Sequence, residues 1–291
     1  MNPYVTFLQG CGLPEDVNND GVVDVADIQL VASRWRTSQG EPNYVPAYDL
    51  DGDGDIDIVD IMRVSSHWGQ TCVNDVAGLI AAINTAKANG VGLDTINLAT
   101  GTYTLTAVDN GYNGLPVVTS SITINGNSAT IMRDSAASPF RIFEITTTGS
   151  LTLNSLTLSG GRTAENGGAI YNDGGILTII SSTLSGNTAT YHGGWVGYYD
   201  GVGGAIYNNG GTVNITSSTL SGNTGERWSG GIRNNGGQVT VMNSTISNNN
   251  AGGVGGGIDN SSGTVTVTNS TLSGNTANLG GGIANNGTLN V

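Results

Sequence analysis

Hydrophobic and polar residues alternate through much of the second half of the chain, a pattern typical of half-buried β-strands rather than of helices. From residue 149 the alternation falls within a repeat. Segments that begin at residues 149, 175, 211, 237 and 263 align without gaps, at intervals of 26, 36, 26 and 26 residues. Each repeat closes with a glycine pair and a short strand, as in GGAIYNDG and GGAIYNNG. The long interval contains an insertion around residues 191–202.

Three short strands per turn, with glycines at the corners, predict a right-handed parallel β-helix in which successive turns stack ~4.8 Å apart. The expected inward ladders are Leu151/Leu177/Val213/Val239/Val265, Leu153/Ile179/Ile215/Val241/Val267, Leu158/Leu184/Leu220/Ile246/Leu272 and Ile170/Ile206/Ile232/Ile258/Ile283. Two asparagine columns should bond from turn to turn as structural elements. They are Asn172/Asn208/Asn234/Asn260/Asn285 and Asn187/Asn223/Asn249/Asn275.

The segment before the repeats, residues 73–148, leads into this coil. Residues 73–90 predict a helix with Val76, Leu79, Ile80 and Ile83 on one face, stopped by Asn-Gly. Such a helix would cover the N-terminal end of the coil, where an open strand edge would otherwise invite pairing. Residues 91–148 predict less regular first turns, before the regular repeats of 149–291. Val291 stops inside a repeat, so we expect the coil to continue or its end to be covered.

The first quarter of the chain has another pattern, an acidic segment that is duplicated. DVNNDGVVDVADIQLVASRW at 16–35 matches DLDGDGDIDIVDIMRVSSHW at 49–68. Each copy has oxygen side chains at loop positions 1, 3, 5, 9 and 12, glycine at position 6 and a backbone carbonyl at position 7, a spacing that surrounds one calcium ion. The predicted ligands of two ions are Asp16, Asn18, Asp20, Val22, Asp24 and Asp27, then Asp49, Asp51, Asp53, Asp55, Asp57 and Asp60.

A loop followed by a helix, twice, with aspartate at position 12, resembles the type I dockerin module over residues 11–72. The resemblance implies an EF-hand-like α-helical domain that folds on binding calcium and docks onto a cohesin module. It also implies that loop positions 10 and 11, here Val25, Ala26, Ile58 and Val59, help to choose the partner. These apolar pairs could instead pack against the neighbouring domain. We therefore divide the chain into a dockerin-like domain at 1–72 and a mainly β domain at 73–291.

Cys11 and Cys72 flank the duplicated segment. The two ends of a pseudo-symmetric module tend to lie together, so a disulfide that clasps them is one interpretation, and two unrelated free thiols are the other. A disulfide would favour an extracellular or cell-surface location.

Composition and charge exclude several classes of function. The net charge is −13, and 12 of the 22 acidic residues lie in residues 1–72. An acidic chain without a basic patch repels phosphate backbones, so nucleic-acid binding is not expected. No apolar stretch is long enough for a transmembrane segment.

The repeats resemble those of polymorphic outer-membrane and autotransported surface proteins, a likeness that indicates fold better than function. The residue after each isoleucine of the short strand should point outward, which makes Arg233 and Asp259 an exposed ion pair beside stacked tyrosines. With the aromatics of nearby loops, these residues form either a carbohydrate platform or a cover over a hydrophobic corner. The predicted ligand-binding residues are Tyr171, Tyr207, Arg233, Asp259, Trp195, Tyr198, Tyr199 and Trp228.

Hydrolysis of a glycan would need two carboxylates, and those nearest the platform are Glu165, Asp200 and Glu226. The leading interpretation is a calcium-dependent attachment protein whose coil contacts polysaccharide or a cell surface. The alternatives are a dockerin-borne polysaccharide lyase or hydrolase, and a structural subunit whose dockerin binds another copy of the chain to build a filament.

Overall fold

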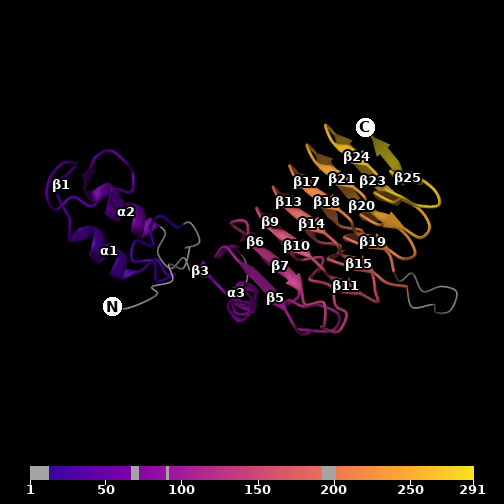
Figure 1. Cartoon of the computed structure of the whole chain (residues 1–291), viewed down its shortest axis with the longest axis horizontal. Helices are drawn as coiled ribbons and strands as arrows, with labels where there is room; N and C mark the ends of the chain where they lie inside the picture. The colour runs from indigo at the N-terminus through magenta and orange to yellow at the C-terminus, as the bar shows by residue number, and fades with distance from the viewer. Residues whose placement is uncertain (1–12, 67–71, 90–91, 192–200) are drawn as a thin grey trace. The chain divides into compact units, whose positions relative to one another are not determined.

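The computed structural model describes residues 13–66, 72–89, 92–191 and 201–291. The chain divides into two compact units, residues 1–74 with 97–100 and residues 75–96 with 101–291 (Figure 1). The first unit is small and contains most of the helical residues, whereas the second is a long coil of parallel strands.

The first unit places a helix after each acidic loop. Its elements are α1 (Val25–Ala32), β1 (Thr37–Ser38), the 3₁₀ helix η1 (Pro46–Tyr48), β2 (Asp55–Ile56), α2 (Ile58–Ser66) and β3 (Cys72–Val73). β1 and β2 pair antiparallel. The core of this unit is a cluster of four buried residues, Val23, Val31, Ile56 and Val64. So small a core leaves much of the order to other interactions.

The second unit is a β-solenoid of about eight turns, and Figure 1 shows its strands stacked in succession. This confirms the predicted mainly β fold with a parallel β-helix. Its strands form three faces. Face A contains β4 (Leu93–Leu98), β6 (Ser121–Asn125), β9 (Ser150–Asn154), β13 (Ile176–Ile180), β17 (Thr212–Thr216), the second halves of β20 (Ile232–Met242) and β23 (Ile258–Thr268), and β26 (Thr288–Asn290).

Face B is a separate seven-stranded sheet made of β5 (Thr102–Leu105), β7 (Thr130–Arg133), β10 (Thr157–Ser159), β14 (Thr183–Ser185), β18 (Thr219–Ser221), β21 (Thr245–Ser247) and β24 (Thr271–Ser273). Face C contains β8 (Phe143–Ile145), β12 (Ile170–Asp173), β16 (Ile206–Asn209), the first halves of β20 and β23, and β25 (Ile283–Asn285). β20 and β23 belong to two faces because each continues through the corner between them.

The strand register confirms the predicted ladders. Leu177 pairs with Leu151 on one side and with Val213 on the other, and Leu184 and Ile206 lie in ladders of the same kind. These side chains are fully buried, so each turn covers the hydrophobic face that its neighbour exposes.

Both asparagine columns form as predicted. Asn172 Nδ2 donates to Asn208 Oδ1 at 2.8 Å, and Asn208 Nδ2 donates to Asn234 Oδ1 at 2.9 Å. In the second column Asn187 donates to Asn223 Oδ1 through both its backbone N–H and its Nδ2. The amides thus bond one another and nearby backbone carbonyls at these corners.

Two features go beyond the predicted coil. A fourth row of two-residue strands follows face B, made of β11 (Arg162–Thr163), β15 (Thr188–Ala189), β19 (Thr224–Gly225) and β22 (Asn250–Ala251). The glycines that follow this row allow neighbouring turns to approach closely. A Cβ on Gly168 would lie 2.1 Å from the carbonyl oxygen of Gly204.

The strands of the first turns also pair more regularly than their sequence predicts. β6, β7 and β8 pair in register with β9, β10 and β12 of the first regular repeat. α3 (Val76–Ala88) precedes them, with Asp75 accepting from the N–H of Gly78 as its N-cap. Leu79, Ile83 and Ala86 are its buried residues, and the helix packs near β5 and β6.

Candidate functional site

The first acidic loop is organised by two buried carboxylates. Asp16 accepts the N–H groups of Gly21 at 2.9 Å and of Asp20 at 3.1 Å. Asp27, which is fully buried, accepts those of Asn18 at 3.1 Å and of Asp24 at 2.8 Å. Asp24 in turn caps α1 through the N–H of Ala26 at 2.7 Å. The loop therefore closes on itself through its own acidic side chains.

In the second loop the carboxylates at the same two positions, 1 and 12, accept backbone N–H groups, although only some of the donors are equivalent. Asp49 accepts the N–H groups of Gly52 at 2.8 Å and of Gly54 at 3.0 Å, and Asp60 accepts those of Leu50 at 2.6 Å and of Asp57 at 2.8 Å. At position 7 the N–H groups of Val22 and Asp55 bond the carboxylates of Asp20 and Asp53, each at 3.0 Å. The duplication in sequence thus places accepting carboxylates at the same loop positions in both copies.

These loops fit calcium, by three observations. The donors are all oxygens, and the carboxylates of Asp49, Asp51 and Asp53 each bring an oxygen within 4.8 Å of the others. Gly21 and Gly54 take φ angles of 94° and 98° at position 6, where a side chain would be strained. Desolvation, followed by the negative charge of neighbouring carboxylates, raises the pKa of Asp51, and a cation would offset that repulsion.

Sequence reasoning missed Tyr44, which lies outside the repeated motif. Its hydroxyl donates to Asp49 Oδ2 at 2.6 Å, and this bond raises the pKa of Tyr44 to about 12. No sequence signal links Tyr44 to the loop, since the contact depends on how the segment between the two copies folds back.

The structure describes the four predicted partner residues and one of the two cysteines. Val25, Ile58 and Val59 are exposed, and Ala26 is half-buried. Cys72 takes part in a disulfide, whereas Cys11 lies outside the described residues, so the pairing of Cys11 with Cys72 stays a prediction.

On face C of the coil, the outward positions of successive strands form one continuous row. The register places Glu144, Tyr171, Tyr207, Arg233 and Asp259 side by side on adjacent turns. We call these five residues the outer row. The rings of Tyr171 and Tyr207 lie 5.5 Å apart between centroids. The row therefore has aromatic residues at its centre and charged residues at both ends.

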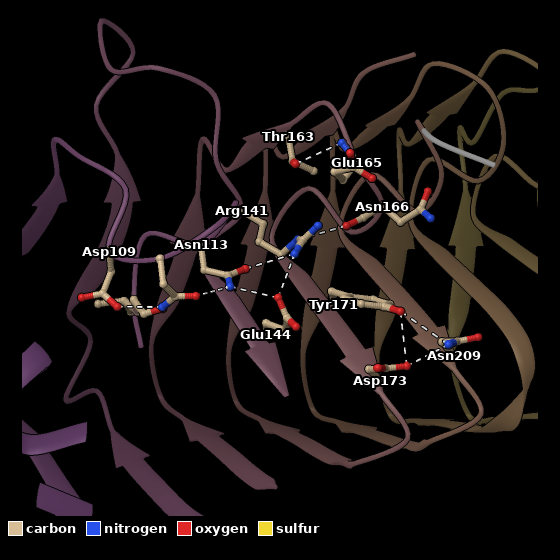
Figure 2. Close-up of polar contacts among 12 residues, drawn as sticks. Asp109, Asn113, Arg141, Glu144, Thr163, Glu165, Asn166, Tyr171, Asp173 and Asn209 are labelled. Carbon is tan, nitrogen blue, oxygen red and sulfur yellow. Dashed lines mark hydrogen bonds and ion pairs between the residues drawn. The ribbon is translucent and has the colours of Figure 1, made fainter. Parts of the chain in front are cut away.

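At the first end of the outer row, Arg141 holds a polar cluster together (Figure 2). Arg141 Nη1 bonds Glu144 Oε2 and Asn113 Oδ1, each at 3.1 Å, and Asn113 Nδ2 donates to the same Glu144 oxygen at 2.9 Å. The guanidinium lies 5.2 Å from the centroid of the Tyr171 ring. Burial lowers the pKa of Arg141, while the charges of Glu144 and then Glu165 oppose that shift.

Beside the row, a line of polar side chains bonds from turn to turn. Figure 2 shows Asn209 Nδ2 donating to Asp173 Oδ1, at 2.8 Å, with the Tyr171 hydroxyl also bonding that carboxylate at 3.2 Å. Asn235 continues the line by donating to Asn209 Oδ1 at 3.0 Å. Burial, followed by the charge of Asp173, raises the pKa of Tyr171 to about 12.

At the other end of the row lies a pocket of about 560 Å³. Its lining includes Tyr207, Trp228, Arg233 and Asp259. Arg233 and Asp259 form the ion pair that the sequence predicts, but the predicted exposure is wrong, because their side chains are only 12% and 1% exposed. Tyr207 is 8% exposed. Loops before face C cover this part of the row, with the Trp228 ring 5.1 Å from the Arg233 guanidinium carbon.

The carboxylates considered for hydrolysis do not form one group. Glu165 lies within electrostatic reach of Arg141, which also bonds Glu144, and sequence reasoning missed Glu144. Glu226 is exposed and accepts the N–H of Tyr191 at 2.9 Å. Asp200 lies outside the described residues, as do the predicted ligand-binding residues Trp195, Tyr198 and Tyr199. Glu144 was missed because its strand belongs to the irregular turns, where the repeat cannot be aligned.

Comparison with known proteins identifies the first unit. Residues 14–67 match the Dockerin type I domain, which confirms the resemblance seen in the duplicated loops. No curated protein and no solved structure matches the chain. A dockerin binds calcium and indicates calcium-dependent assembly with a cohesin partner, typically outside the cell or on its surface. Among the described helices, none is long and apolar enough to cross a membrane.

Proposed function

We propose that this chain is an attachment protein of an extracellular assembly, in which the dockerin binds a cohesin module and the coil contacts polysaccharide. Two calcium ions would be held, one by Asp16, Asn18, Asp20, Asp24 and Asp27 with the Val22 carbonyl, the other by Asp49, Asp51, Asp53, Asp57 and Asp60 with the Asp55 carbonyl. Bound calcium neutralises the crowded carboxylates, which then hold the start of each helix through the backbone bonds described above.

The proposed cohesin contact is supported by apolar side chains at equivalent places on the two helices. Val25 is the first residue of α1, and Ile58 and Val59 are the first two residues of α2. All three are exposed although they are apolar, and exposed apolar groups at a rigid helix start suit a protein partner. Their position next to Asp24 and Asp57 makes the same surface dependent on calcium.

The observation that carries the polysaccharide proposal is the outer row. The rings of Tyr171 and Tyr207 lie 5.5 Å apart at an interplanar angle of 42°, with amides and carboxylates beside them, and Tyr171 is half-buried whereas Tyr207 is 8% exposed. The half-buried Tyr171 ring and its polar neighbours would together supply the apolar face and the hydrogen-bonding groups that a sugar ring requires. The turns repeat every ~4.8 Å, so successive sugars of an extended chain would meet successive turns of the coil.

Two binding assays test these halves separately. In millimolar calcium, the full chain should bind an immobilised cohesin, and Ile58→Asp should weaken that binding at least ~10-fold while Ile176→Asp, on exposed face A, leaves it unchanged. Insoluble polysaccharides should retain the chain with or without EDTA, because the outer row lies outside the calcium loops. Retention by no polysaccharide would refute the second half. Growth of the sedimentation coefficient with concentration would instead favour self-assembly.

Glycan hydrolysis is a second candidate function, because Glu144 and Glu165 both face Arg141 and a hydrolase needs two carboxylates near one bond. Glu144→Gln and Glu165→Gln should then each abolish release of reducing ends from a polysaccharide, with Glu226→Gln as the control. Equal release by the two variants and the wild type would exclude this pair.

A further inference from the structure

The two acidic loops differ at position 3, where the first has an amide and the second a carboxylate. In the first loop, Asn18 Nδ2 donates to Asp20 Oδ2 at 2.9 Å. In the second loop, Asp51 has no N–H group in its side chain to offer Asp53, and the carboxylates of Asp49, Asp51 and Asp53 each bring an oxygen within 4.8 Å of the others. The second loop therefore has one more carboxylate among its predicted ligands, and these charges repel one another without that internal donor.

The loops also differ at position 1, where a side chain from outside the second loop bonds its carboxylate. Asp49 Oδ2 accepts from the Tyr44 hydroxyl at 2.6 Å and from the N–H of Gly54 at 3.0 Å, and Asp49 Oδ1 accepts the N–H of Gly52 at 2.8 Å. Asp16, at position 1 of the first loop, accepts only backbone N–H groups among the described residues. Three donors thus orient the Asp49 carboxylate, and the phenol has no counterpart in the described part of the first loop.

The Tyr44 side chain is itself held in place by the segment between the two copies. Its ring packs against the buried core of the dockerin. The same segment bonds the second loop twice more, because Ser38 pairs with Asp55 in the β1–β2 ladder and the N–H of Gln39 donates to the carbonyl of Gly54 at 2.7 Å. A side chain already anchored in this way loses little freedom when it orients a ligand. Tyr44 therefore makes the second loop more rigid at position 1.

We propose that the second loop binds calcium more tightly than the first, and that Tyr44 is a positioning residue that orients Asp49 for the ion. This rests on the proposed binding of two calcium ions by the dockerin and adds the order in which the loops fill. The affinity of a calcium loop depends on the charge count of its ligands and on the rigidity of the site. The second loop exceeds the first in charge through Asp51 and in rigidity through Tyr44.

The order of filling extends to the proposed cohesin surface. Asp57, a predicted ligand of the second loop, accepts the N–H of Val59 at 2.6 Å at the start of α2. Asp24 makes the equivalent bond at the start of α1. Because calcium neutralises the carboxylates that hold each helix start, Ile58 and Val59 should be ordered at a lower free calcium concentration than Val25.

The test measures each loop separately in the full chain. Hydrogen exchange with mass spectrometry, at a series of buffered free calcium concentrations, gives one midpoint for a peptide covering residues 16–24 and another for a peptide covering residues 49–57. The midpoint of the second loop should lie at least ~10-fold lower in free calcium. Tyr44→Phe keeps the ring and removes only the hydroxyl, so it should raise the midpoint of the second loop ~10-fold and leave that of the first unchanged.

Other variants separate positioning from packing. Tyr48→Phe is the matched control, because Tyr48 packs against the same core but bonds no carboxylate among the described residues, and both midpoints should stay those of the wild type. If Tyr44→Phe unfolds at a lower temperature than the wild type, the exposed Asp51 replaces it. Asp51→Asn should raise the midpoint of the second loop, and Asn18→Asp should lower that of the first.

Each outcome decides the proposal. Equal midpoints in the wild type, or a Tyr44→Phe variant that shifts both loops alike or neither, overturn the inference while the two calcium ions stand. Calorimetry on the same protein counts the ions. A single ion, bound at the second loop, would overturn the proposal of two ions and keep the order of affinities. Uptake of no calcium overturns both.

Discussion

The dockerin and the coil satisfy their backbone N–H groups in different ways. In the dockerin, carboxylates such as Asp27 and Asp60 accept them, and the hydrophobic core is a cluster of four buried residues. In the coil, carbonyls and asparagine amides of the next turn accept them, over a buried ladder on each face. We therefore expect order in the dockerin to depend on neutralising the charge of its loops, and order in the coil to depend on the neighbouring turn.

Removal of calcium should give the largest difference in stability between the two units. With excess EDTA, the carboxylates of the loops repel one another and the small core cannot hold the helices, so the amides of Leu50 and Gly54 should lose all protection from hydrogen exchange. Amides of face A and face C should keep theirs. Exchange followed by mass spectrometry measures both at once. Unchanged protection in the dockerin, or loss of protection in both units, would contradict this distinction.

A cavity in the coil should destabilise the coil alone. Ile206→Ala removes a fully buried ladder residue and should lower the free energy of unfolding of the coil by ~2–5 kcal/mol. Ile176→Ala is its matched control, because Ile176 is 47% exposed on β13 and should change stability by less than ~0.5 kcal/mol. Denaturant unfolding, monitored through the β-sheet signal, gives both free energies of unfolding. Calcium titration should show that both variants bind calcium with the affinity of the wild type.

An interrupted asparagine column should have a smaller effect of the same kind. Asn208→Ala removes both the Oδ1 that accepts from Asn172 Nδ2 and the Nδ2 that donates to Asn234 Oδ1, which should cost ~1–3 kcal/mol. Asn290→Ala removes an exposed amide and should cost much less. If both substitutions had equal effects in the same unfolding assay, the column would not contribute to the stability of the coil.

The smallest expected effect is a pH dependence within the outer row. The pKa of Tyr171 is raised to about 12 in the fold, against an ordinary value of 10.0. Because the folded state favours the neutral phenol, the stability that Tyr171 contributes is fully present below pH 10 and falls as the pH rises through about 12. Absorbance at 295 nm of the wild type minus that of Tyr171→Phe should show one phenol titrating late. A difference curve centred near pH 10 would contradict the burial of that hydroxyl.

Much of the dockerin was predictable because its geometry is local. Asp16 and Asp27, or Asp49 and Asp60, lie within one twelve-residue loop, so spacing alone brings them to one centre. Tyr44 was not predictable, because it reaches Asp49 from a segment without repeat. In the coil the ladders were predictable for a similar reason, since one repeat length fixes which residues stack.

The main prediction that the structure overturned is the exposure of the Arg233–Asp259 ion pair. Their places on adjacent turns follow from the 26-residue repeat, but alternation indicates only that they point away from the coil interior. Whether that side meets water depends on the loops before face C, which vary between turns and place Trp228 against Arg233. Glu144 and Arg141 escaped prediction because the first turns have loops of irregular length.

The sequence by itself determined the duplicated acidic loops, the coil, its ladders and the order of the outer row from Tyr171 to Asp259, because all of these depend on spacing along the chain. Only the tertiary structure decided that the end of this row is a pocket, that the pair of Arg233 and Asp259 is buried there, and that Arg141 bonds Glu144. These depend on how loops from different turns close over one another, and non-repeating loops carry no periodic signal of where they will lie.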